Sequence, residues 1–164
     1  MNPSFQFDAD GLSDVQILWE DGDRVFCRGW RADGAGGRSA ALAVQPAAER
    51  PVPAAFDRLA HEYELRDELD GLWAARPLAL VHEGGRTALL LDDPGGEPLE
   101  RLIGGPIEAG RFLPFAIGIA AAIGKVHQRG LVHKDVKLIF NSCGPNASSK
   151  LLILLAPAGD FEKL

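Results

Sequence analysis

Short apolar runs separated by polar, glycine-containing turns mark the first third of the chain. The runs "VQILWE" (15–20), "RVFCRGW" (24–30) and "SAALAV" (39–44) have the composition of strands. The turn signals "DGD" and "ADGAGG" separate them. Because each run follows the previous one through a short turn, we expect a three-stranded meander.

A helix is expected over residues 54–72, where apolar side chains recur at helical spacing and charged residues fall between them. The apolar stripe consists of Phe56, Leu59, Ala60, Tyr63, Leu65 and Leu69. Two further apolar runs, 76–83 and 86–93, flank the pair Gly84-Gly85. Two adjacent glycines between apolar runs predict a tight hairpin.

The remaining pattern is mainly helical. The stretch "PGGEP" (94–98) ends the last strand and resembles a hinge, and "LERLIG" predicts a short helix. A longer helix is expected over 109–128, with Gly130 at its C-terminal cap. The pattern therefore predicts three strands, one helix, two strands, a hinge and then a helical part.

Composition narrows the class of protein. The chain is 46% hydrophobic and 24% charged, as is ordinary for a globular domain, and its net charge of −6 argues against nucleic-acid binding. The start lacks the basic and apolar regions of a secretory signal, and the apolar stretch 115–124 is too short to span a bilayer. Cys27 and Cys143 form no CxxC motif. We expect a reduced, cytoplasmic protein without a membrane partner.

Candidate chemistry is concentrated in the loop "GLVHKDVK" (130–137), which places His133, Asp135 and Lys137 at alternate positions. Phosphoryl transfer depends on positioning and charge stabilisation. An Asp can orient a hydroxyl group and accept its proton, and a Lys two residues later can reach the transferring phosphate. The alternative is a solvated, charged turn after a helix.

The longer stretch "GKVHQRGLVHKDVK" resembles the approach to the catalytic loop of protein kinases. Together with "HEYELRDELDGLWAARPLAL" and "LLDDPGGEPLERLIG", it is similar to the N-terminal serine/threonine kinase-like domain of bacterial hybrid kinase, ATPase and sensor histidine kinase proteins. The resemblance covers about residues 15–137. It implies an α+β fold, in which a small lobe with a five-stranded antiparallel sheet and one helix precedes the first helices of an incomplete large lobe. The domains it implies are a leader (1–14), a kinase-like small lobe (15–93), a hinge with the start of a large lobe (94–137) and an atypical tail (138–164).

The resemblance implies roles for the loop residues. Asp135 is similar to the catalytic aspartate, Lys137 to the lysine that contacts phosphate, and His133 to the histidine that braces the loop. The family activity is phosphoryl transfer from ATP, with Mg²⁺, to Ser or Thr of a protein substrate. We expect Asp135 and Lys137 to line the floor of a nucleotide cleft under the sheet.

The resemblance also implies a nucleotide site on the small lobe. Backbone groups around Leu91, Asp92 and Asp93 would contact adenine, and Glu97 lies where kinases often contact the ribose. The alternative for Glu97 is a carboxylate at a helix N-terminus. Glu62 occupies the position of the small-lobe helix glutamate that pairs with a lysine on the third strand.

Several positions depart from the kinase pattern. Val44 or Gln45 stands where the strand-three lysine belongs, so Glu62 is expected to lack its partner. Phe140 stands at the position of the magnesium-binding asparagine, and Asn141 is one residue late. No glycine-rich phosphate loop of the kinase type, D-F-G or A-P-E motif is present, and no protein metal ligand is assigned.

The tail changes in composition, since all 12 Arg precede residue 138. Its "KLLILLAPAG" predicts a buried strand or, alternatively, an exposed apolar end. We therefore expect a kinase-like domain truncated after the catalytic loop, with weak or absent catalysis. The alternatives are a pseudokinase-like module that binds a partner protein or itself through the helix 115–124, and a remnant without function.

Overall fold

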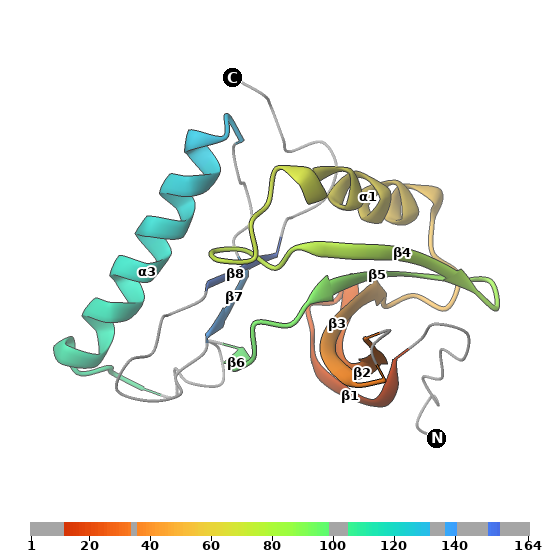
Figure 1. Ribbon diagram of the computed structural model, residues 1–164, viewed down its shortest axis with the longest axis horizontal. Coiled ribbons are helices and arrows are strands. Elements are labelled where there is room, and N and C mark those ends of the chain that lie inside the picture. The colour runs from red at the N-terminus through yellow and green to blue at the C-terminus, as the bar shows by residue number, and fades with distance from the viewer. Residues whose placement is uncertain (1–11, 34–35, 99–104, 132–136, 141–150, 155–164) are drawn as a thin grey trace. The chain divides into compact units, whose positions relative to one another are not determined.

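The computed structural model describes residues 12–33, 36–98, 105–131, 137–140 and 151–154 (Figure 1). The strands are β1 (Ser13–Glu20), β2 (Arg24–Ala32), β3 (Arg38–Pro46), β4 (Pro77–Glu83), β5 (Arg86–Asp92), β6 (Glu97–Pro98), β7 (Lys137–Phe140) and β8 (Leu151–Leu154). The helices are α1 (Pro53–Glu64), a short 3₁₀ helix (Leu65–Asp67) and α3 (Ala109–Gln128). Contacts divide the chain into two compact units, one comprising residues up to Tyr63 with Pro77–Asp93 and the other Glu64–Arg76 with residues from Pro94 onward.

The first unit is built on a five-stranded sheet in the order β1-β2-β3-β5-β4. Neighbouring strands are antiparallel throughout. The expected three-stranded meander and the expected hairpin around Gly84-Gly85 are therefore confirmed. The α+β fold class is confirmed as well. Each strand begins and ends within two residues of its expected bounds, because turn residues delimit the runs.

The β4–β5 hairpin shows why two glycines occur together. Gly84 and Gly85 have φ values of 57° and 75°, and Glu83 pairs with Arg86 across them. A two-residue turn of this kind requires positive φ at both central positions, which side chains with a Cβ rarely adopt. The sequence pair thus fixes the register of β4 against β5.

The two faces of the sheet follow from the register of its central strands. Arg28 pairs with Leu42 and Phe26 with Val44, so these four side chains project from one face. Helix α1 lies along the sheet, and its buried side chains are Leu59 and Glu62 (Figure 1).

The other face of the sheet has a separate apolar cluster. Its buried members are Leu12, Val25, Cys27, Ala41, Ala43 and Leu90. Gly29 of β2 lies on this side against Leu12, and a Cβ at Gly29 would approach the Leu12 Cβ to 2.8 Å. Glycine at this position therefore lets residue 12 approach the backbone of β2.

Helix α1 is shorter than the sequence predicts. The expected helix over 54–72 ends at Glu64, continues as the 3₁₀ helix Leu65–Asp67 and then gives way to turns. Leu65 and Leu69 keep the apolar spacing but belong to the second unit, where they pack in a cluster with Ala122 and Val126 of α3. The predicted apolar spacing is present, but its side chains pack in two different cores.

The second unit contains α3, whose bounds Ala109–Gln128 match the expected helix. Gly130 has a φ of 71°, and its N–H donates to the carbonyl of His127, as expected for a C-terminal cap. A separate three-stranded sheet has the order β6-β7-β8, so part of the apolar tail forms a strand, β8. None of the described helices is both long enough and apolar enough to cross a membrane.

Candidate functional site

A buried ion pair joins α1 to the sheet. Nη1 of Arg24 donates to Oε1 of Glu62 at 2.9 Å, and the two side chains are only 10% and 4% exposed. The expectation that Glu62 lacks a partner is therefore wrong. The cation comes from β2, 38 residues before the glutamate, instead of from β3.

Strand register explains why β3 does not supply the cation. Val44 pairs with Phe26 and is fully buried, on the face from which Phe26 projects. Gln45 is also buried but, as the next residue of the strand, projects from the opposite face. Arg24 lies two residues before Phe26 and therefore projects from the same face as Val44.

The β1–β2 turn holds Arg24 in place through Asp21. Oδ1 of Asp21 accepts hydrogen bonds from the backbone N–H groups of Asp23 at 3.1 Å and Arg24 at 2.7 Å. Its Oδ2 accepts a further bond from Nε of Arg24 at 3.4 Å. The guanidinium also lies 5.2 Å from the centroid of the Phe26 ring, which stacks on Trp19. Arg24 is thus positioned by two carboxylates and an aromatic ring.

Burial raises the pKa of Glu62 from 4.5 to about 8, and the nearby Asp21 carboxylate adds to this shift. Arg24 acts in the opposite direction, by charge and by its hydrogen bond. The net direction is upward because the cost of burying the charged carboxylate exceeds the favourable effect of Arg24 on it.

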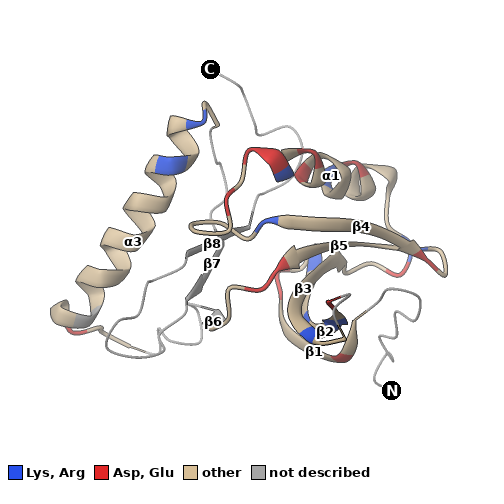
Figure 2. Ribbon diagram, in the orientation of Figure 1, with Lys and Arg blue, Asp and Glu red and all other residues tan. Residues whose placement is uncertain are grey.

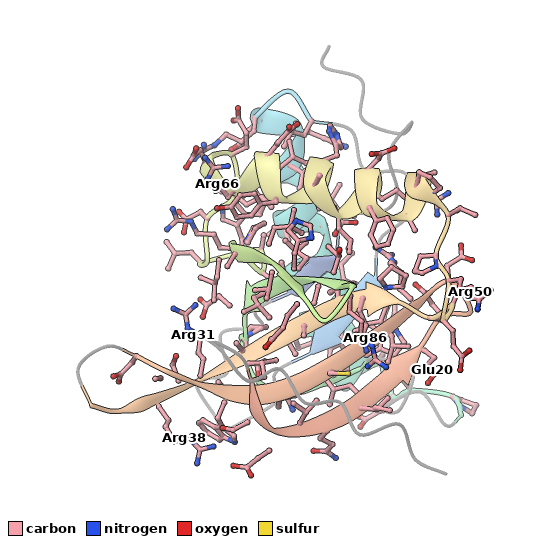
Figure 3. The ribbon with its side chains drawn as sticks, turned by 90° about the vertical axis from the view of Figure 1, so that its right-hand side faces the viewer. Glu20, Arg31, Arg38, Arg50, Arg66 and Arg86 are labelled. Atoms are coloured by element: carbon pink, nitrogen blue, oxygen red, sulfur yellow. The ribbon has the colours of Figure 1, made fainter. Side chains whose placement is uncertain are left out.

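A cavity of about 260 Å³ adjoins this ion pair. Arg24, Arg50 and Arg58 are among its lining residues, and Asp23 is the acidic residue in the lining. Arg58 lies on α1, with its Nη1 atom 3.8 Å from Oδ2 of Asp23. Figure 3 shows Arg50 at the end of the sheet opposite Arg31 and Arg38. Three arginines and one aspartate therefore line the cavity, and two of the arginines, Arg24 and Arg58, have carboxylate partners.

The expected adenine-binding segment is also tied to β2. Asp93 follows β5, and its carboxylate accepts two bonds from Arg28, at 2.6 Å from Nε and 3.2 Å from Nη2. Leu91 is buried within β5 between Leu42 and Pro77, whereas the side chain of Asp92, at the end of the strand, is exposed. Contact of these backbone groups with adenine stays a prediction.

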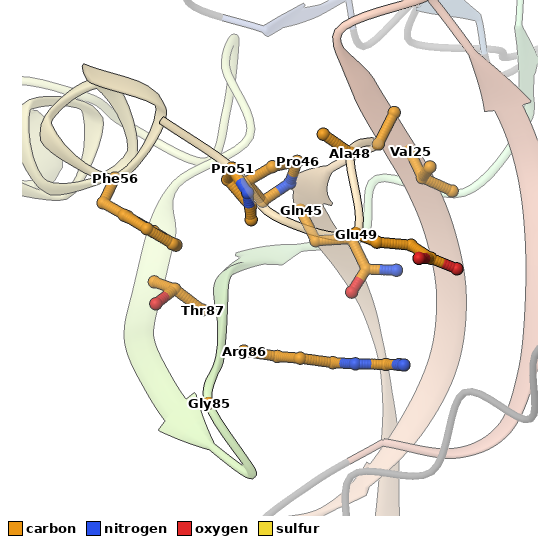
Figure 4. Close-up of a pocket in the computed structure, with 11 residues that line it drawn as sticks. Val25, Gln45, Pro46, Ala48, Glu49, Pro51, Phe56, Gly85, Arg86 and Thr87 are labelled. Carbon is orange, nitrogen blue, oxygen red and sulfur yellow. The ribbon is translucent and has the colours of Figure 1, made fainter. Parts of the chain in front are cut away.

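A larger cavity, of about 420 Å³, shares the lining residues Pro46, Ala48 and Pro51 with the cavity beside the ion pair. Figure 4 shows Phe56 and Thr87 on one side of it and Val25 on the other. Gln45, Glu49 and Arg86 contribute its polar groups. The lining does not include Glu62 or Arg24, so this cavity is separate from the ion pair.

The residues of the expected catalytic loop are only partly within the described structure. His133 and Asp135 lie outside the described residues. Lys137 begins β7 and pairs through its backbone with Leu154. Glu97 lies in β6, paired with Phe140. The proximity of Asp135 and Lys137 to a nucleotide stays a prediction.

Comparisons with known proteins add no family assignment. No protein-family model matches the chain, and no curated protein matches it in sequence. Among the residues that the structure describes, no cluster of three or more His, Cys, Asp or Glu side chains could hold a metal ion.

Sequence reasoning missed Arg24, Arg28 and Asp21 as parts of this site. A signal was present, because Arg24 and Arg28 alternate with Phe26 in a strand that is otherwise largely apolar. Charged side chains that share a strand face with a buried aromatic residue require partners. Their partners, however, lie in a turn, a distant helix and the segment after β5, and these are brought together only by the fold.

Proposed function

We propose that the chain is a protein-kinase-like domain whose small lobe binds ATP–Mg and whose transfer of phosphate to protein hydroxyl groups is weak. The observation that carries the proposal is the buried pair between Glu62 of α1 and a cation on the sheet. In protein kinases the corresponding helix glutamate pairs with the lysine that contacts the nucleotide phosphates.

The order of elements supports this function. Three antiparallel strands, a helix and two further strands precede the segment 93–98, which is the order of a kinase small lobe and hinge. The motif "GLVHKDVK" follows α3, as a catalytic loop would. In the proposed reaction the oxygen of a protein hydroxyl forms a bond to the γ-phosphorus as the bond to the β–γ bridging oxygen breaks. Asp135 accepts the hydroxyl proton, and ADP leaves.

Weak transfer follows from the groups that differ from the kinase pattern. Acidic residues Glu20, Asp21 and Asp23 surround the β1–β2 turn, where a glycine-rich loop would offer backbone N–H groups to phosphate. The side chain of phenylalanine, at position 140, has no oxygen with which to bind Mg²⁺ where asparagine is expected. Each missing electrostatic contact costs a few kcal/mol of barrier in comparable enzymes.

Thermal unfolding with nucleotide tests the binding function. We expect ATP with Mg²⁺ to raise the midpoint of unfolding in a concentration-dependent manner, since a ligand that binds only the folded state stabilises it. Transfer of the γ-phosphate to a generic protein substrate is measured alongside, with Asp135→Asn as the matched control. An unfolding midpoint that ATP–Mg does not shift would contradict the proposal.

A second candidate is a module that binds a partner protein, and one surface favours it. Charged residues are sparse along α3 (Figure 2), and Phe112, Leu113 and Ile117 are 51%, 55% and 66% exposed. Exposed apolar side chains that gather on one helix are typical of interaction sites. Loss of self-association in Ile117→Asp, with an unchanged thermal midpoint, would support this candidate.

A further inference from the structure

The cavity of about 260 Å³ beside Arg24 has the chemistry of an anion site. Three arginines line it, from β2, α1 and the segment between β3 and α1. Guanidinium groups bind phosphate oxygens through charge-assisted and often bidentate hydrogen bonds. The chain carries a net charge of −6, so a concentration of arginines around one cavity is not a property of its surface in general.

Arg24 differs from the other two arginines in how firmly it is held. It is 8% exposed and contacts Glu62, Asp21 and the ring of Phe26, whereas Arg58 is about one-third exposed and Arg50 is exposed. A guanidinium whose orientation is fixed by neighbouring groups loses little conformational entropy when it binds a ligand. The geometry therefore makes Arg24 the fixed element of the site.

We propose that Arg24 is the residue that binds the nucleotide phosphates in this domain, in place of the absent strand-three lysine. The adjacent cavity lined by Arg50 and Arg58 receives those phosphate groups. Glu62 acts as a positioning residue that orients Arg24. This inference rests on the proposed nucleotide-binding function and names the residues that would carry it.

The site on β2 is consistent with the pairing of the sheet. Arg24 pairs with Pro46, at the end of β3, and Pro46 also lines the cavity. The cation therefore lies at the same end of the sheet as the β1–β2 turn, since Gly22 and Asp23 of that turn line the cavity too.

The test measures the affinity of the purified full chain for four probes by calorimetry: ATP with Mg²⁺, ADP, adenosine and pyrophosphate. We expect Arg24→Ala to weaken ATP and pyrophosphate binding about tenfold or more, because charge-assisted hydrogen bonds are lost. Adenosine affinity should stay within about twofold. Arg24→Lys should restore part of the ATP affinity. Arg31→Ala, at the far end of the same strand, is the matched control and should change nothing.

Truncation of Arg24 removes a partner of the buried Glu62 carboxylate and could unfold the protein. A second variant therefore separates loss of binding from loss of the fold. The double variant Arg24→Gln/Glu62→Gln replaces the ion pair by a neutral pair of similar size, and circular dichroism checks its fold. Arg50→Ala/Arg58→Ala changes only the less buried arginines and should also weaken pyrophosphate binding. A folded double variant that binds ATP as the wild type does would overturn the inference.

The outcomes separate the inference from the function on which it rests. ATP binding that is unaffected by every Arg24 variant leaves nucleotide binding intact and overturns the role of Arg24. Pyrophosphate binding that depends on Arg24, without any contribution from adenosine, supports the phosphate site and overturns the nucleotide function. Failure of the wild type to bind any of the four probes overturns both.

Discussion

Arg28 and Asp93 form a bidentate ion pair across the width of one strand. Arg28 lies on β2 and Asp93 follows β5, and β3 runs between these strands in the sheet. The Asp93 side chain is 2% exposed and that of Arg28 is 22% exposed. The pair therefore connects the strand that carries Arg24 to the segment expected to contact adenine.

Removal of this pair should destabilise the fold. We expect Arg28→Ala and Asp93→Ala each to lower the free energy of unfolding by about 2 kcal/mol, because hydrogen bonds to charged groups contribute about 1.5–3 kcal/mol. Urea denaturation of both variants and of the double variant gives the coupling energy between the two positions. The exposed pair Arg38–Asp14 is the control, and its coupling energy should be no more than about 1 kcal/mol. Equal coupling for the two pairs would contradict the structural role.

The raised pKa of Glu62 predicts how stability depends on pH. The folded-state pKa is about 8 and the ordinary value is 4.5, so the folded state binds more protons between these pH values. The contribution of Glu62 to stability is therefore full below about pH 4.5 and decreases as the pH rises to about 8.

Glu62→Gln should remove this dependence, because Gln resembles the protonated carboxyl group in shape and does not titrate. The difference in unfolding free energy between variant and wild type should shift in favour of the variant from pH 5 to pH 8, as measured by urea titration at each pH. A difference that is constant with pH, or that shifts in favour of the wild type, would show that Glu62 is ionised throughout.

Two glycine substitutions should have opposite effects. Gly29→Ala places a Cβ at 2.8 Å from the Leu12 Cβ, so we expect a loss of about 1–3 kcal/mol. Gly124→Ala, within α3, meets no atom within 4 Å and should gain up to about 1 kcal/mol. Thermal and urea unfolding of both variants check the signs. A loss at Gly124 or a gain at Gly29 would be inconsistent with the packing described.

Cys27 should react slowly with thiol reagents in the folded protein. Burial, together with the charge of Glu20, raises the pKa of its thiol from 9.0 to about 11. The thiolate is the reactive form, so near pH 8 this shift alone lowers the rate about 100-fold. Labelling in a Cys143→Ser background, with and without urea, measures the difference. A rate that urea does not increase would mean that Cys27 is accessible and ionisable in the fold.

Much of the fold could be predicted from local signals. Glycine-rich turns and apolar runs located all five strands of the first sheet, and Gly130 marked the end of α3. The end of α1 could not be predicted in this way. Leu65 and Leu69 continue its apolar spacing, and only the tertiary structure shows that they pack against α3 residues in another core.

The candidate site was less predictable because its central contact depends on distant pairing. Glu62 was singled out from the sequence, but its partner Arg24 is 38 residues away and follows an acidic turn. A search of β3 alone could not find the cation, since register places Val44 on the relevant face and Gln45 on the other. The alternation of side chains along β2, which places Arg24 on the same face as Phe26, is the information that was needed.

The Asp21 carboxylate gives the β1–β2 turn an anion of its own. It accepts hydrogen bonds from two backbone N–H groups and from Nε of Arg24. An oxyanion that binds through these donors must displace the Asp21 carboxylate, which is part of the turn and so always lies beside them. If phosphate binds Arg24 as proposed above, its arrival at this corner of the sheet exchanges one negative group for another.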